Sequence, residues 1–373
     1  MIKQSEIAHI LPTHVPYAFD DTSMDFILMQ QRLRYLDAIR GIAALTVVLS
    51  HFIERTPLHQ TWFFSNFNLG QFGVVLFFIL SGMVIPYSLK SEYGGVRFFI
   101  VSRFFRLYPA YWFSVFIAVI TSMLFFQIQP EIKVVLLNTT MLQSVFGIPD
   151  LFGVYWTLII ELLFYGLCVF IFIFGLLKNK TSNFIIAVSF LILAVAMSWL
   201  RWYLDRKIPV AVPLALSLMF FGSLWREATV KKDIYSRNLC IWWTICFALS
   251  LPAICFLAYS KSYGFGENPI AYLMTYACSV AFFIVMTSKW KLTFRPFIFL
   301  GTISYSMYLL HQFALELFSS EFNISGDFSF LKLSLYLLVV LPLSYLSYRF
   351  IEKPSLIFSI KIKDKLHFAQ KTL

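Results

Sequence analysis

An acid, a guanidinium and an imidazole are spaced along one apolar segment near the start of the chain. Arg40 and His51 are eleven residues apart, which on a helix places them within roughly 20° of each other and about 16 Å apart along the axis. Asp37 precedes Arg40 by about one turn on nearly the same face. Ionisable groups cost roughly 2.5–3.5 kcal/mol each inside a membrane, so this stripe predicts a functional site. The simpler alternative is that Asp37 and Arg40 anchor the helix while His51 bonds a neighbouring carbonyl.

The composition indicates that such a segment lies in a membrane. The 373 residues are 59% hydrophobic and 13% charged, with a mean hydropathy of +0.76, far from the values of soluble domains. We expect an all-α polytopic membrane helical bundle with about ten transmembrane helices. The expected spans are 37–56, 70–88, 102–126, 152–176, 184–200, 210–225, 239–259, 270–288, 297–317 and 332–351. The piece 132–147 is too short to span and is expected to be interfacial or re-entrant.

The loops predict orientation and domain limits. Lysine and arginine collect in alternate loops, so both termini are expected in the cytoplasm. Residues 1–33 are expected to be a cytoplasmic extension and not a signal peptide, because they lack an apolar core. The membrane domain is expected at 34–355 and a basic cytoplasmic tail at 356–373. The net charge of +11 is therefore assigned to cytoplasmic loops and not to nucleic-acid binding. The five cysteines lack metal spacing and read as packing residues, so no metal is expected.

This topology converts sequence positions into depths. His51, Glu161 and His311 each fall roughly 5–8 Å from the bilayer midplane on the non-cytoplasmic side. Their common depth predicts one shared buried site. Tyr165 lies on the same helical face as Glu161, and Tyr308 lies on the same face as His311. Both tyrosines are therefore expected to orient the residues of this site. The alternative is three independent polar packing contacts.

A second cluster is expected at the cytoplasmic level. Arg103 and Arg106 are three residues apart at the start of the third span, level with Arg40. Arginine forks suit bidentate phosphate binding, so three on facing helices predict a site for a polyanionic ligand. For any one of them, ordinary interfacial anchoring is the alternative.

Six motifs in this order resemble the acyltransferase-3 family of integral membrane acyltransferases. The first is the Arg40-x10-His51 spacing, and the second is FGVVLFFILSG at 72–82. The Arg103/Arg106 pair follows, then YWTLIIE at 155–161, ISYSMYLLH at 303–311 and IEKP at 351–354. The resemblance covers nearly the whole chain. It implies acyl transfer, usually of acetyl, from cytoplasmic acyl-CoA to a hydroxyl of an extracytoplasmic glycan.

The same resemblance implies a setting and an acceptor class. Family members act on lipopolysaccharide O-antigen, exopolysaccharide, peptidoglycan or lipo-oligosaccharide, so the expected location is the bacterial cytoplasmic (inner) membrane. Larger members carry a fused extracytoplasmic domain, and this chain is expected to be the stand-alone form. Acetyl-CoA is the expected donor.

The chemistry assigns a role to each residue. His51 is expected to be the general base that takes the proton of the sugar hydroxyl, with a transient acyl-histidine as the alternative. Glu161 is expected to tune the site, and His311 to bind the acceptor or support His51. Arg40, Arg103 and Arg106 would hold the phosphates of the donor. Structural or orienting roles are expected for Asp37, Ser81, Tyr165 and Tyr308. Ser81 is not expected to be a nucleophile, because no base is evident beside it.

A transporter or flippase of a lipid-linked glycan is the alternative function. It too would need an arginine-lined entrance and buried histidines, although the chain shows none of the internal repeats common in transporters. The expected partners are the lipid bilayer and the glycan, and homo-oligomerisation is left open.

Overall fold

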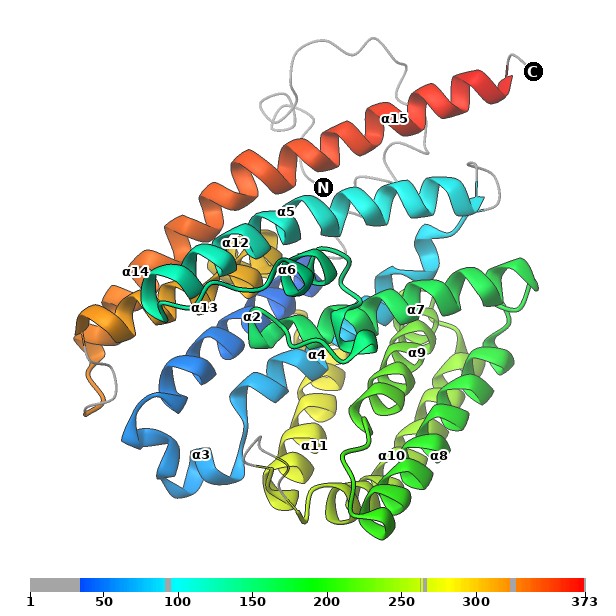
Figure 1. Cartoon of the computed structure of the whole chain (residues 1–373). Coiled ribbons are helices and arrows are strands. Elements are labelled where there is room, and N and C mark those ends of the chain that lie inside the picture. The colour runs from blue at the N-terminus through cyan, green and yellow to red at the C-terminus, as the bar shows by residue number, and fades with distance from the viewer. Residues whose placement is uncertain (1–33, 91–94, 262, 264–266, 323–326, 372–373) are drawn as a thin grey trace, which may run out of the picture.

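The structure is a computed structural model that describes residues 34–90, 95–261, 263, 267–322 and 327–371. These residues form an all-α bundle in which no strand occurs (Figure 1), which confirms the predicted fold class. The extension predicted for residues 1–33 lies outside the described residues. The helices are α2 (Arg34–Glu54), α3 (Trp62–Asn66), α4 (Leu69–Val84), α5 (Gly95–Phe125), α6 (Ile132–Asn138), α7 (Trp156–Ile173), α8 (Lys180–Leu204), α9 (Ala211–Thr229), α10 (Ile234–Ala258), α11 (Pro269–Val285), α12 (Arg295–Thr302), α13 (Ser304–Phe322), α14 (Phe330–Ser347) and α15 (Lys353–Lys371).

Eight helical segments of the described chain are long and apolar enough to cross a membrane. They include α2, α4, α5, α7, α8, α10, α11 and the α14–α15 segment. The other two expected spans are also helical. Helix α9 is buried from Pro213 to Leu224, and the expected span 297–317 is divided into α12 and α13 at Ile303. The piece 132–147 contains only the short α6 and a turn of 3-10 helix.

Two close helix crossings bring the core together, and each depends on a pair of glycines. Where α2 crosses α12, a Cβ on Gly41 would lie 2.0 Å from the Phe297 carbonyl oxygen, and one on Gly301 would lie 1.9 Å from that of Asp37. Small residues let membrane helices approach at backbone distance, because no side chain separates them. This crossing fixes the position of the first turns of α2.

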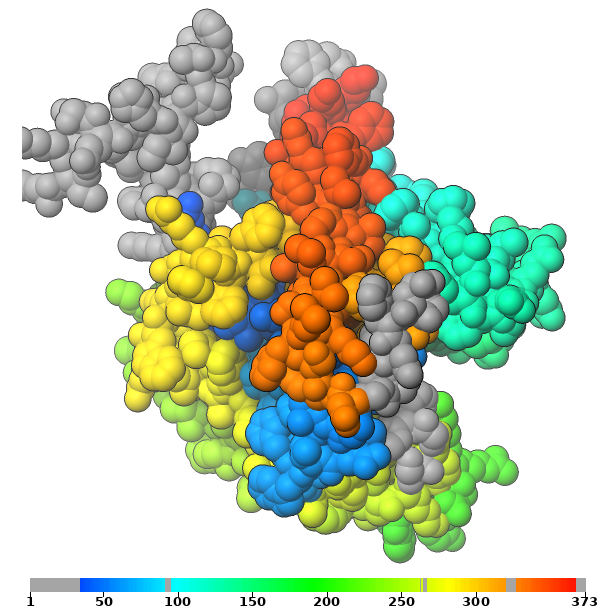
Figure 2. All heavy atoms as spheres, turned by 90° about the vertical axis from the view of Figure 1, so that its left-hand side faces the viewer, coloured from blue at the N-terminus to red at the C-terminus, as the bar shows by residue number. Residues whose placement is uncertain are grey.

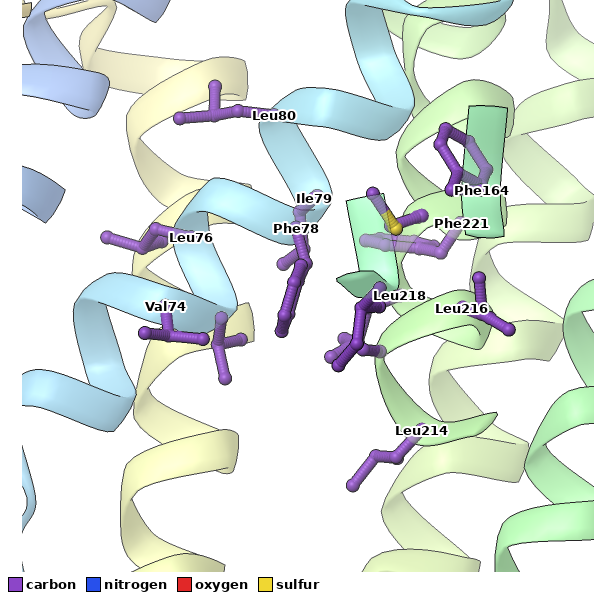
Figure 3. Packing of buried hydrophobic residues seen from close by; sticks show 14 of the residues in the cluster. Val74, Leu76, Phe78, Ile79, Leu80, Phe164, Leu214, Leu216, Leu218 and Phe221 are labelled. Carbon is purple, nitrogen blue, oxygen red and sulfur yellow. The ribbon is translucent and has the colours of Figure 1, made fainter. Parts of the chain in front are cut away.

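The second crossing joins α4 to α9. A Cβ on Gly82 would lie 1.8 Å from the Met219 carbonyl oxygen, and one on Gly222 would lie 2.2 Å from that of Ile79. Beside these contacts, Phe78 of α4 lies across from Leu218 of α9 (Figure 3). Gly82 and Gly222 thus allow the backbones of α4 and α9 to approach closely.

Large apolar side chains cover the outside of the α8–α10 region. Trp199, Trp202, Trp242 and Leu249 are each at least half exposed. In a bilayer such a surface faces lipid, and tryptophan is enriched near the membrane–water interfaces. This part of the bundle therefore forms a lipid-facing wall.

The C-terminal helices form one long column. Helix α14 continues through a π-helical turn, Tyr348–Glu352, into α15. The expected domain boundary at 355/356 thus falls inside a helix. Figure 2 shows this orange-to-red column, and α15 packs along α5 (Figure 1). The packing places the π-helical turn beside the arginine-bearing part of α5.

Helix connections gather at two ends of the bundle. The α8–α9 connection, the end of α10 and the start of α11 lie at the lower end of Figure 1, with α3. There, Arg201 and Glu267 form a buried ion pair at 2.7 Å. The α7–α8 and α9–α10 connections lie at the opposite end. With the adjoining helix turns included, that end carries Lys178, Lys180, Arg226, Lys231, Lys232 and Arg237, and the lower end carries Arg201, Arg206, Lys207 and Lys261. This separation agrees with the loop pattern used to predict the topology.

Candidate active site

A cavity of about 440 Å³ lies among α2, α4, α5, α7, α12 and α13. All three predicted phosphate-binding arginines line it, which are Arg40, Arg103 and Arg106. Other predicted site residues also line it: Asp37, Ser81, Glu161, Tyr165 and Tyr308. Its size falls within the range of small-molecule pockets, about 300–1,000 Å³. The structure thus gathers the arginines in one place.

Two of the three arginines are paired with carboxylates. The Arg40 guanidinium donates to Asp37 at 2.8 Å, one helical turn away. Arg106 forms an ion pair with Glu352 of the π-helical turn, whose side chain is fully buried. Glu352 also accepts a hydrogen bond from Ser306 at 3.0 Å. These pairs neutralise two cations and fix their guanidinium planes.

Arg103 is in a different environment. Within the described part of the chain it forms no ion pair, and its buried Nε lacks a hydrogen-bond partner. Its guanidinium carbon lies 5.5 Å from the Phe99 ring centre and 5.7 Å from that of Tyr165. Cation–π contacts of this kind orient a guanidinium without neutralising it. Arg103 is therefore the cavity cation best placed to accept an anionic ligand.

Glu161 belongs to this cavity. It accepts a hydrogen bond from the Tyr165 hydroxyl, one turn along α7. Glu161 is expected from the sequence to share a site with His51 and His311. In the described part of the chain Glu161 lines the arginine cavity, whereas neither histidine is among the residues that line it. Depth along the membrane normal gives no lateral position, so groups at one level can belong to different sites.

Tyr308 stands between the cavity and the histidines. Its hydroxyl donates to the Val154 carbonyl at 3.0 Å and lies 2.8 Å from the Thr157 hydroxyl. Its ring centre lies 6.0 Å from that of Phe77 and 6.1 Å from that of His311. The expected orienting role of Tyr308 thus corresponds to a position at the cavity wall next to His311.

His51 and His311 form a stacked pair across α2 and α13. Their ring centres are 5.2 Å apart with an interplanar angle of 20°. His311 is fully buried, whereas the His51 side chain is 29% exposed. His311 Nδ1 lies 3.2 Å from the Met307 carbonyl, which can only accept, so this nitrogen carries the hydrogen. Its Nε2 has no partner among the described residues.

His51 has a carboxylate partner of its own. Its Nδ1 lies 2.8 Å from Glu54 Oε2, and an ionised carboxylate can only accept. In the neutral ring this contact places the hydrogen on Nδ1 and leaves on Nε2 the lone pair that a general base needs. The structure thus brings His51 and His311 together as predicted, and adds Glu54 to them.

Two carboxylates that contact site residues, those of Glu54 and Glu352, are not among the residues predicted from the sequence. Glu54 could have been found from its i,i+3 spacing to His51 on one helix. Glu352 lies in the IEKP motif, but its approach to Arg106 depends on packing between α5 and the π-helical turn. In the described part of the chain no group of His, Cys, Asp and Glu could hold a metal ion.

Comparison with known proteins defines the class. Residues 33–349 match the family model of the acyltransferase domain of acyltransferase-3 proteins. The chain therefore belongs to the acyltransferase-3 family. No solved structure matches this chain.

Two relatives show what kinds of protein the chain is similar to. It is 28% identical over 364 residues to "Putative peptidoglycan O-acetyltransferase YrhL" of Bacillus subtilis (strain 168), covering 86% of this chain and 54% of that protein. It is 24% identical over 380 residues to "O-acetyltransferase OatA" of Staphylococcus aureus (strain MRSA252), covering 91% of this chain and 60% of the relative. The chain thus spans little more than half the length of these relatives.

Proposed function

We propose that this protein is a membrane O-acyltransferase that moves an acyl group, acetyl in the simplest case, from acyl-CoA to a hydroxyl of a glycan. The single observation that carries this proposal is the arrangement along α2, where Arg40 enters a cavity with Arg103 and Arg106, and His51 stacks on His311 further along the helix. Family membership supports the reaction class, and the names of the relatives support acetyl and glycan.

The donor would bind by its phosphates in the arginine cavity. Arg103 offers an uncompensated charge, while Arg40 and Arg106 offer guanidinium edges already oriented by Asp37 and Glu352. The carboxylates of Asp37, Glu161 and Glu352 match the three guanidinium groups in number, but Arg103 has no direct ion-pair partner among the described residues, so we expect phosphate to contact Arg103 first. A neutral cavity also avoids the cost of isolated buried charge when no donor is bound.

The transfer itself would take place at the histidine pair. His51 Nε2 accepts the proton of the glycan hydroxyl while the oxygen attacks the thioester carbonyl carbon. The new carbon–oxygen bond forms and the carbon–sulfur bond breaks, and the His51 imidazolium returns the proton to the departing thiolate. Acyl-CoA and a hydroxyl thus give an acyl ester and free CoA. The passage of the acyl arm from cavity to His51 would lie past Tyr308.

We infer an orientation in which the arginine cavity faces the cytoplasm and His51 faces the outside of a bacterial inner membrane. The excess of lysine and arginine in the α7–α8 and α9–α10 connections with their adjoining helix turns supports it, because cytoplasmic ends are enriched in these residues. An acceptor such as peptidoglycan, O-antigen or exopolysaccharide would then reach His51 from the side where its ring is exposed.

Reconstitution tests the reaction class. Purified protein in lipid nanodiscs is given acyl-labelled acyl-CoA with and without glycan fragments, and free CoA and acylated glycan are measured. Glycan-dependent CoA release is the expected result. Transport of the glycan across proteoliposomes without any thioester consumption would instead identify a transporter or flippase.

Orientation has its own test. Single cysteines at Lys232 and Lys207, in a cysteine-free background, report on the two ends of the bundle in intact cells. We expect an impermeant maleimide to label position 207 and not position 232. The reverse pattern would show that the cavity opens to the outside.

A further inference from the structure

The outer end of α2 carries a three-residue network around His51. Glu54 Oε2 lies 2.8 Å from His51 Nδ1, and the Ser50 hydroxyl donates to Glu54 Oε1 at 2.9 Å. Both carboxylate oxygens are therefore engaged, one by the imidazole and one by a buried hydroxyl. The carboxylate has a fixed plane, which in turn fixes the rotation of the imidazole.

The neighbouring charges leave Glu54 free for this task. Arg55, the adjacent residue, forms its ion pair with Glu316 of α13. His311 stacks on a face of the His51 ring and offers no carboxylate. In the described part of the chain the one ion pair recorded for His51 is with Glu54.

We propose that Glu54 is the positioning residue of the acyl-transfer site, holding His51 with Nδ1 protonated and Nε2 directed at the acceptor hydroxyl. Ser50 supports it by fixing the second carboxylate oxygen. This inference rests on the proposed function, because it gives Glu54 a role only if His51 is the base.

The role follows from how an imidazole works as a base. A neutral imidazole has one protonated nitrogen, and only the other can take a proton. With Glu54 present, the Nδ1–H tautomer is favoured and the imidazolium formed during attack lies beside a negative charge. Without Glu54, the ring can rotate or adopt the other tautomer, and the imidazolium loses its counterion.

The location of Glu54 suits a test by chemical rescue. Its side chain is 46% exposed, so removal of the carboxylate leaves a space that small ions can reach. Formate is a carboxylate small enough to occupy such a space. A residue with a purely structural role would not be replaced by a diffusible anion.

The experiment compares Glu54→Ala, Glu54→Gln, Glu54→Asp and His51→Ala in nanodiscs, with Glu316→Gln as the matched carboxylate control. We measure kcat, the KM of acyl-CoA and the KM of the glycan, each with and without formate. Glu54→Ala is expected to lower kcat by about 10- to 100-fold with each KM within about twofold. Formate should restore part of kcat in Glu54→Ala and none in His51→Ala. Glu54→Asp should retain more kcat than Glu54→Gln, and Glu316→Gln should be close to wild type.

Each contrary outcome has a separate meaning. If His51→Ala is inactive but Glu54→Ala and Glu54→Gln keep wild-type kcat, the role of Glu54 is overturned and the proposed function stands. If kcat falls without formate rescue while the KM of the glycan rises, Glu54 binds the acceptor and the positioning role is wrong. If His51→Ala retains activity, the proposed function itself fails. Donor binding by every variant serves as the check that the protein is folded.

Discussion

The arginine cavity and the histidine pair share helix α2, yet they differ in how their charged groups are arranged. In the cavity, Asp37 and Glu352 compensate Arg40 and Arg106, and Arg103 is oriented by aromatic rings. At the other end, two imidazoles are stacked, and the Glu54 carboxylate lies against the more exposed ring, that of His51. A binding site for charge needs cations that stay ionised, whereas a proton-transfer site needs a group able to change its charge. Substitutions at the histidine pair are therefore expected to change turnover, whereas substitutions in the arginine cavity are expected to change donor affinity or stability.

The largest expected effect is at the histidine pair. His51→Ala removes the proton acceptor but no phosphate contact, so acyl transfer should fall by about 10²- to 10⁴-fold while the Kd of acyl-CoA stays within about twofold. Activity assays with calorimetric donor binding measure both. His59→Ala is the matched control, because that imidazole lies in the 3-10 turn that follows α2, with its Nδ1 2.6 Å from the Thr56 carbonyl oxygen. Transfer at near wild-type rate by His51→Ala would refute the assignment of the base.

Removal of Arg106, the ion-pair partner of buried Glu352, should mainly lower the stability of the protein. Arg106→Met leaves Glu352 buried without its cation, a change that typically costs about 3–5 kcal/mol. We expect a large fall in thermal stability in detergent, and partial recovery in the Arg106→Met/Glu352→Gln double variant, where the stranded charge is removed. Equal stability of the single and double variants would show that this pair is not coupled.

Arg103 should behave in the opposite way, with a large effect on binding and a small one on folding. Arg103→Ala breaks no ion pair in the described structure, so the melting temperature should change little. The Kd of acyl-CoA should rise about 10- to 100-fold, as expected for loss of a charge-assisted hydrogen bond worth about 1.5–3 kcal/mol. Arg237→Ala, at an exposed position on α10, is the control. An unchanged Kd of acyl-CoA in Arg103→Ala would show that the donor does not bind at Arg103.

The cavity wall is held by backbone contact, and this too can be tested. Gly82→Ala places a methyl group against the Met219 carbonyl, whereas a Cβ on Gly166 of α7 meets nothing within 4 Å. Gly82→Ala should lower the free energy of unfolding by about 1–3 kcal/mol through overpacking. Gly166→Ala should be neutral or slightly stabilising, since alanine favours helix. Similar melting temperatures for the two variants would contradict the close crossing of α4 and α9.

The smallest effect is expected for Glu161→Gln. The amide can still accept from Tyr165, so the hydrogen bond survives while the negative charge is lost. We expect a change in donor affinity of a few-fold, about 1 kcal/mol or less, together with slower turnover. A selective loss of kcat as large as that of His51→Ala would place Glu161 in proton transfer and erase the distinction between the two regions.

Features contained within one helix could be predicted from the sequence. Arg40, His51 and Asp37 share α2, so helical periodicity was enough to give their relation. The same rule would have found Glu54, because it needs only the next turn of that helix. Hydropathy located the helical segments of the bundle, since an apolar run long enough to span is a property of the chain itself.

Features that depend on packing between helices could not be predicted in this way. Glu161 was placed with the histidines from its depth, but rotation and lateral position of α7 direct it into the arginine cavity. The division of 297–317 at Ile303 lies two residues after Gly301, where α12 approaches the backbone of α2. Glu352 reaches Arg106 through a π-helical turn, whose register the sequence pattern does not reveal.

The central claim is that donor and acceptor meet from opposite sides of the membrane, at opposite ends of α2. Oriented proteoliposomes test it most directly, with labelled acyl-CoA supplied only on the side of the arginine cavity and glycan fragments only on the side of His51. We predict acylated glycan on the His51 side, no label there when acyl-CoA is supplied on that side alone, and no product with His51→Ala. Acylation only when both substrates share one side would contradict transfer across the bilayer.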